Sequence, residues 1–66
     1  MMYEYRVVAV EGLTEKSYEE GAEVVQTALN ENVLDGWDFV CQSPADYEGT
    51  LDAMFLTFRR ALESVN

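Results

Sequence analysis

The chain has 66 residues, enough for one hydrophobic core and too few for two, so we expect a single domain over residues 1–66. One cysteine excludes an intrachain disulfide, and the lack of histidine excludes the common zinc sites. Thirteen acidic residues against four basic ones give a net charge of −9, which argues against direct binding to nucleic acid or to an anionic membrane.

The first predicted element is a β-strand over residues 2–11 (MYEYRVVAVE), because the segment is rich in Val and Tyr and its side chains alternate in type. Gly12 ends it. One face of this strand carries Tyr3, Tyr5, Val7 and Ala9, and the other carries Glu4, Arg6, Val8 and Val10.

A helix of about 17 residues is predicted next. Ser17 and Glu20 match a capping box, with Ser17 as the N-cap, and Thr14 is an alternative cap one turn earlier. Gly36 is suited to end the helix in a left-handed conformation. The apolar stripe expected to face the sheet consists of Tyr18, Ala22, Val25, Ala28, Leu29 and Val33.

Two further strands are predicted after the helix. Residues 37–42 (WDFVCQ) return to a period of two, and residues 51–60 (LDAMFLTFRR) are apolar on both faces. The segment between them, residues 43–50 (SPADYEGT), has the composition of a loop, with Pro, Gly and two acidic residues.

This order predicts an α+β fold of the β-α-β-β type, with a three-stranded mixed sheet and one helix packed on one face. The crossover through the helix makes the first two strands parallel, and the loop returns the third strand antiparallel. We place the third strand in the centre because it is apolar on both faces, whereas Glu4 and Arg6 suit an edge strand.

The sheet face without a helix is expected to be apolar over an area larger than a small monomer usually exposes. A second copy of the chain would cover this face, so we expect a homodimer. The predicted interface residues are Val8, Val10, Val40, Ala53 and Phe55.

Three segments together resemble a known family: residues 3–8 (YEYRVV), 35–40 (DGWDFV) and 55–60 (FLTFRR). The chain resembles the small bacterial and phage proteins called domain of unknown function 4177, with their Y-x-Y-x-V-V, G-W-acidic-apolar-V and F-x-R pattern. The resemblance implies a strand–helix–strand–strand domain and brings no established activity. The longer acidic segment 43–50 and the single Lys depart from the family's pattern.

No catalytic, cofactor or metal site is predicted. Cys41 has no histidine to activate it, and burial in the middle of a strand would make it inert. Glycine-rich nucleotide-binding motifs are missing, and the acidic residues lack the spacing of a calcium loop. Glu19 and Glu23, one helical turn apart, would hold a cation only weakly, so a solvated acidic face is the preferred interpretation.

The remaining conspicuous residues favour structural roles. Gly36 is expected to cap the helix and Trp37 to pack against its end. Arg59 and Arg60 are expected to form ion pairs, and the alternative is a clamp for an anion.

We therefore predict a cytoplasmic, non-enzymatic interaction or regulatory module that binds itself and a basic protein surface. No signal peptide or membrane span is recognisable in the sequence. Two alternatives stay open: an inhibitor that mimics nucleic acid, and a surface adapted to a salty cytoplasm. The predicted partner-binding residues are Glu19, Glu20, Glu23, Glu31, Asp46, Tyr47 and Glu48.

Overall fold

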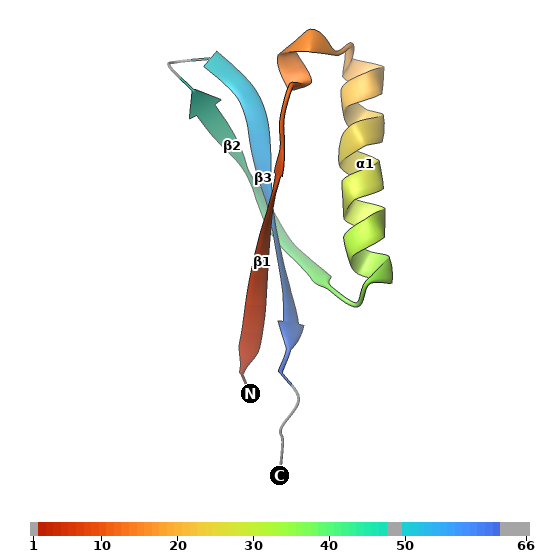
Figure 1. Cartoon of the computed structure of the whole chain (residues 1–66), viewed down its shortest axis with the longest axis vertical. Helices are drawn as coiled ribbons and strands as arrows, with labels where there is room; N and C mark the ends of the chain where they lie inside the picture. Colours follow the sequence, from red (N-terminus) through yellow and green to blue (C-terminus); the bar gives the residue numbers. More distant parts are fainter. Residues whose placement is uncertain (1, 48–49, 63–66) are drawn as a thin grey trace.

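The computed structural model describes residues 2–47 and 50–62, with the side chains of residues 46, 47, 50 and 51 left out. Strand β1 (Tyr3–Val10) leads through a 3₁₀ turn, η1 (Leu13–Glu15), into helix α1 (Tyr18–Leu34). Strands β2 (Asp38–Tyr47) and β3 (Thr50–Ala61) follow, and α1 lies along one side of the twisted sheet (Figure 1).

The sheet order is β1-β3-β2, and β3 pairs antiparallel with both neighbours. The predicted α+β fold with a central third strand is thus confirmed. β1 and β2 run parallel to each other, as the crossover requires, but β3 separates them, so every hydrogen-bonded pair is antiparallel. The two edge strands are β1 and β2.

The predicted loop over residues 43–50 is wrong for most of its length. Pairing continues from Ser43, opposite Phe55, to Tyr47, opposite Thr50. Pro44 is compatible with this pairing because β2 is an edge strand, where a residue without an N–H donor is tolerated. The register shifts between Ala45 and Asp46.

Helix α1 begins and ends where its capping residues predict. The Glu20 backbone N–H donates to Ser17 Oγ at 3.2 Å, and the Ser17 N–H donates to Glu20 Oε1 at 3.1 Å. At the other end, Gly36 has φ 93°, and the Trp37 N–H bonds the Asn32 carbonyl at 3.0 Å. The left-handed Gly36 and this hydrogen bond satisfy a carbonyl at the helix end and turn the chain into β2.

The hydrophobic core lies between α1 and one face of the sheet. Its buried members are Val10 of β1, Trp37 just before β2, and Leu56 and Phe58 of β3. From α1, only Val25, Ala28 and Leu29 pack against them. The predicted apolar stripe was therefore too wide.

Three members of that stripe, Tyr18, Ala22 and Val33, are exposed, because the helix meets the sheet along a narrower face than the stripe covers. Tyr18 is 99% exposed and Val33 is 54% exposed. The helix buries Asn32 instead, at 7% exposure.

The predicted placement of Val8 and Val10 on the open face of the sheet is also wrong. Val8 lies opposite Leu56 and Val10 opposite Met54, and residues directly opposite share a face. Val10 is 5% exposed and belongs to the core. The face turned away from α1 carries the other set of β1 side chains: Tyr3, Tyr5, Val7 and Ala9.

Candidate interaction surfaces

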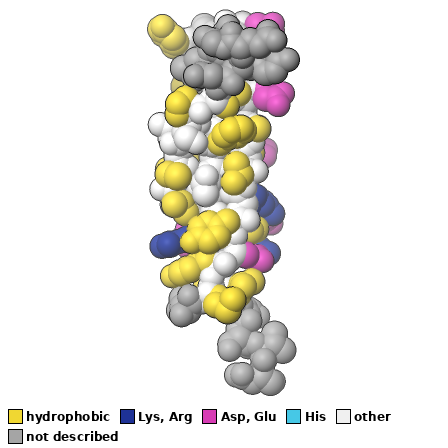
Figure 2. Space-filling model, turned by 90° about the vertical axis from the view of Figure 1, so that its left-hand side faces the viewer, with side chains coloured by type: hydrophobic (Ala, Val, Ile, Leu, Met, Phe, Trp, Pro, Cys, Tyr) yellow, Lys and Arg dark blue, Asp and Glu magenta, His cyan; other side chains and the backbone are white. Residues whose placement is uncertain are grey.

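The first candidate surface is the open sheet face, which we define as Tyr3, Tyr5, Val7 and Ala9 of β1, Phe55 of β3 and Cys41 of β2. Tyr5 and Val7 are each 61% exposed, and Phe55 is 41% exposed. Figure 2 views the side of the molecule away from α1 and shows hydrophobic side chains through much of the part that is not drawn in grey. A sheet face of this kind is normally covered in a stable small protein.

Charges of both signs accompany the open sheet face. The Arg59 guanidinium lies 4.4 Å from the centre of the Tyr3 ring, and Arg59 sits opposite Asp38 in the register. This local balance matters because the whole chain has a charge of −9. The open sheet face therefore carries one positive and one negative group beside its apolar side chains.

Several of the predicted interface residues lie elsewhere. Phe55 is on the open sheet face, whereas Val8 and Val10 face the helix. Val40 is 42% exposed and falls where the register of β2 shifts, and Ala53 lines a groove beside α1.

Cys41 is exposed, so the expected burial of this thiol is wrong. The shift in register after Phe39 places Cys41 opposite Thr57, on the face away from the helix. Phe39 packs against Phe58 instead, with ring centroids 5.8 Å apart. The extra residue in β2 thus redirects the side chains that follow it.

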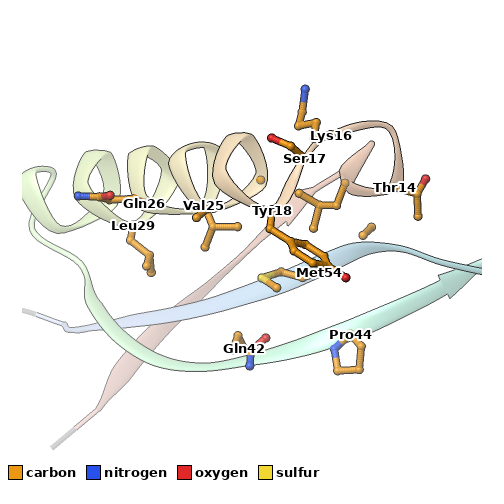
Figure 3. Close-up of a pocket in the computed structure, with 14 residues that line it drawn as sticks. Thr14, Lys16, Ser17, Tyr18, Val25, Gln26, Leu29, Gln42, Pro44 and Met54 are labelled. Atoms are coloured by element: carbon orange, nitrogen blue, oxygen red, sulfur yellow. The ribbon is translucent and has the colours of Figure 1, made fainter.

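The second candidate surface is a groove between α1 and the β2–β3 hairpin, with a volume of about 920 Å³ (Figure 3). β2 begins near the C-terminal end of α1 and diverges from the helix toward the helix's N-terminal end (Figure 1). Polar groups at its border come from Thr14, Lys16, Ser17, Gln26 and Gln42. The apolar lining of this α1–hairpin groove consists of Leu13, Tyr18, Gly21, Ala22, Val25, Leu29, Pro44, Ala53 and Met54.

Small residues on the helix help to keep this groove open. Gly21 and Ala22 present little or no side chain, and a Cβ added to Gly21 would meet Leu13 Cδ2 at 3.8 Å, an ordinary contact distance. Tyr18, which is large enough to fill part of the space, is almost fully exposed. The groove therefore exists because the side chains between α1 and the hairpin do not fill the space.

The predicted acidic residues of the helix do not act as one surface. All four are exposed, but at 100° per residue only Glu19 lies beside Gln26 at the border of the groove, whereas Glu23 and Glu31 point away from it. Glu20 is occupied by the capping box, and its hydrogen bonds from the backbone and side chain of Ser17 lower its pKa. Glu48 and the side chains of Asp46 and Tyr47 lie outside the described residues.

At the C-terminal end of the helix, two guanidinium groups enclose the Trp37 ring. Arg6 and Arg60 each lie 4.3 Å from the ring centre. Arg60 also pairs with Glu4, which confirms the predicted ion pair for this residue. We call this arrangement the Arg–Trp–Arg stack.

Hydrogen bonds attach the Arg–Trp–Arg stack to α1. Arg6 Nη1 donates to Asn32 Oδ1 at 2.8 Å and lies 3.5 Å from Asp35 Oδ2. Asn32 Nδ2 in turn donates to the Ala28 carbonyl at 2.7 Å. The sequence could not reveal this cluster, because its members are separated along the chain by a helix and two strands.

No group of three or more acidic, cysteine or histidine residues is placed to hold a metal within the part that the structure describes. Nor does any helix in that part combine the length and hydropathy needed to cross a bilayer.

No family model, no curated protein and no solved structure matches the chain in comparisons with known proteins.

Proposed function

We propose that the protein is a homodimeric interaction module without catalytic activity, in which two copies stack their open sheet faces. The observation that supports this is the exposed area of a single chain, 5236 Å². A compact protein of this mass exposes about 4,200 Å². The excess, about 1,000 Å², is comparable to the roughly 800 Å² that each partner buries in a stable interface.

The shape of the chain supports the same proposal. Its extents are 49 × 24 × 12 Å and its radius of gyration is 14.0 Å. A compact domain of this length has a radius of gyration of about 11 Å. A long, thin two-layer molecule leaves one broad sheet face without a covering layer, and a second copy provides that layer.

Charge favours the open sheet face over the α1–hairpin groove as the dimer contact. The open sheet face combines Arg59 with Asp38, whereas α1, which forms one wall of the groove, carries four exposed glutamates and no basic residue. Bringing two copies of an acidic flank together would cost electrostatic free energy. The apolar side chains of the open sheet face meet no such penalty.

The test is the solution mass by light scattering on a sizing column. We expect about 15 kDa for the native chain, twice the 7.5 kDa of one copy. Phe55→Glu places a charge in the proposed interface and should reduce the mass to that of one chain while circular dichroism stays native. Tyr18→Glu, which removes an aromatic ring and adds the same charge at the groove, should remain dimeric.

A native chain with the mass of one copy would overturn the dimer, and a monomeric Tyr18→Glu beside a dimeric Phe55→Glu would move the interface to the groove. Cys41 provides a second readout because it is the chain's one thiol and lies on the open sheet face. We expect its alkylation to be slower in the native dimer than in Phe55→Glu.

Four further predictions come from the sequence alone. The resemblance to domain of unknown function 4177 and a cytoplasmic location stay predictions. So do the two alternative roles of the acidic surface, nucleic-acid mimicry and salt adaptation. Repeating the mass and unfolding measurements in molar salt tests the last of these, because an acidic surface that serves only salt adaptation predicts a gain in stability there.

A further inference from the structure

We propose that the α1–hairpin groove binds a short amphipathic helix of a partner protein, apolar on one face and bearing Lys or Arg beside it. This inference rests on the proposed role as an interaction module and names the partner's chemistry. It concerns a surface separate from the open sheet face, so both surfaces can be used at the same time.

The dimensions of the groove suit a helix of about three turns. The helix residues that line it run from Tyr18 to Leu29. At 1.5 Å per residue this is roughly 16 Å, the length of a three-turn helix. The volume of about 920 Å³ accepts several apolar side chains, and Gly21 and Ala22 allow close approach of a second helix.

A helix is a better occupant than an added strand. The edge of the sheet that borders the groove is β2, which contains Pro44 and two shifts in register, after Phe39 and after Ala45. Both features interrupt the regular row of donors and acceptors that a new strand would need. The groove therefore offers side-chain packing more than backbone pairing.

The charges beside the groove define the partner's polar residues. The four glutamates of α1 are exposed, and the helix carries no basic residue. Among them Glu19 lies beside Gln26 at the border of the groove and takes part in none of the ion pairs recorded among the described residues. Lys or Arg on the flank of the bound helix would meet it, and the net charge of −9 would accelerate the encounter. A second copy of this chain would present its own acidic flank and is disfavoured.

The test uses a fluorescein-labelled peptide made of two Leu-Lys-Lys-Leu-Leu-Lys-Leu repeats, with binding followed by fluorescence anisotropy. The same peptide with Glu in place of Lys controls for charge. We expect saturable binding of the Lys peptide and none of the Glu peptide. In the groove, Ala22→Trp should abolish binding, whereas Thr27→Trp, at an exposed position on the other side of α1, should bind like the native chain.

A pair of charge variants separates the groove from general attraction to an acidic protein. Glu19→Lys and Glu31→Lys change the net charge equally, but only Glu19 lies at the border of the groove. We expect Glu19→Lys to weaken binding by at least about threefold more than Glu31→Lys does. Equal weakening, unchanged binding by Ala22→Trp, or no binding of the Lys peptide would each overturn the groove proposal.

The outcomes also separate this proposal from the dimer. A native chain of about 15 kDa that fails to bind the Lys peptide overturns the groove proposal alone. If the native chain has the mass of one copy and binds the peptide in the groove, the groove proposal stands and the dimer is overturned. Because Phe55 lies on the open sheet face, Phe55→Glu should bind the peptide as the native chain does.

Discussion

The two ends of the contact between α1 and the sheet differ sharply. At the C-terminal end of the helix, the Arg–Trp–Arg stack and the buried Asn32 close the contact with large, hydrogen-bonded side chains. At the N-terminal end, Gly21 and Ala22 face the hairpin across an apolar groove, and Tyr18 stays in solvent. The contact between α1 and the sheet is therefore closed at the C-terminal end of the helix and open at its N-terminal end.

This difference shows how a small domain can be stable and still present a binding surface. The anchored end concentrates burial and hydrogen bonding, so the helix has a defined position relative to the sheet. The open end leaves the apolar side chains of the groove uncovered, while the contacts at the anchored end hold the helix backbone in place.

The largest expected effect belongs to the anchored end. Phe58 is 0% exposed, and Phe58→Ala should lower the free energy of unfolding by about 3–5 kcal/mol, as for other buried aromatic residues. For a small domain this is a large share of the total stability. Met54→Ala, at a half-buried position in the groove, should cost less than about 2 kcal/mol. Urea unfolding followed by circular dichroism measures both.

Equal losses for these two variants would mean that the groove is packed as tightly as the core. A matched control is Thr27→Ala, which lies on the exposed side of α1 and should change stability by less than about 0.5 kcal/mol.

An intermediate effect is expected for the stack itself. Arg6→Ala removes the contact with the Trp37 ring and leaves the buried Asn32 Oδ1 without its donor. We expect a loss of about 1–3 kcal/mol in stability. Trp37 fluorescence should shift to longer wavelength as water reaches the ring. Lys16→Ala, at the border of the groove, removes the same charge and should change neither quantity by a comparable amount.

The smallest effect concerns the turn beside the groove. Asp52 Oδ1 accepts hydrogen bonds from Thr14 Oγ1 at 2.6 Å and from the Thr14 N–H at 3.3 Å, which joins η1 to β3. Both bonds hold the pKa of Asp52 below its usual value, and the bond from the Thr14 side chain has the larger effect. The ionised form is therefore favoured by folding.

Because the folded pKa is lowered, this stabilisation is complete above the usual pKa of an aspartate and is lost as the pH falls through the folded value. Asp52→Asn should thus be slightly less stable than the native chain at neutral pH, and the difference should shrink at acidic pH. Thermal unfolding of both chains across the acidic range measures this. A difference that stays constant with pH would show that the carboxylate charge is not involved.

Local patterns predicted the elements well because their causes are local. The capping box of Ser17 and Glu20 and the left-handed Gly36 define the bounds of α1 without help from the sheet. The central position of β3 follows from apolar residues on both of its faces. In contrast, alternation along β1 did not reveal which face the helix would cover, because both faces carry valines.

The misplaced residues share a cause that is not local. Cys41 was expected to be buried and residues 43–50 to form a loop, but pairing with β3 extends β2 through Pro44 and an irregularity after Phe39. A shift in register changes the face of every residue after it. Such a shift depends on the partner strand and has no signature in the strand's own sequence.

The sequence by itself therefore determined the order of the elements, the ends of the helix, the central strand and the acidic charge of the chain. Only the tertiary structure decided which face is covered, where the Arg–Trp–Arg stack forms and where the groove opens. Hydrogen-bonded caps and side-chain alternation act over a few residues, whereas faces, stacks and grooves arise from contacts between segments far apart in the chain.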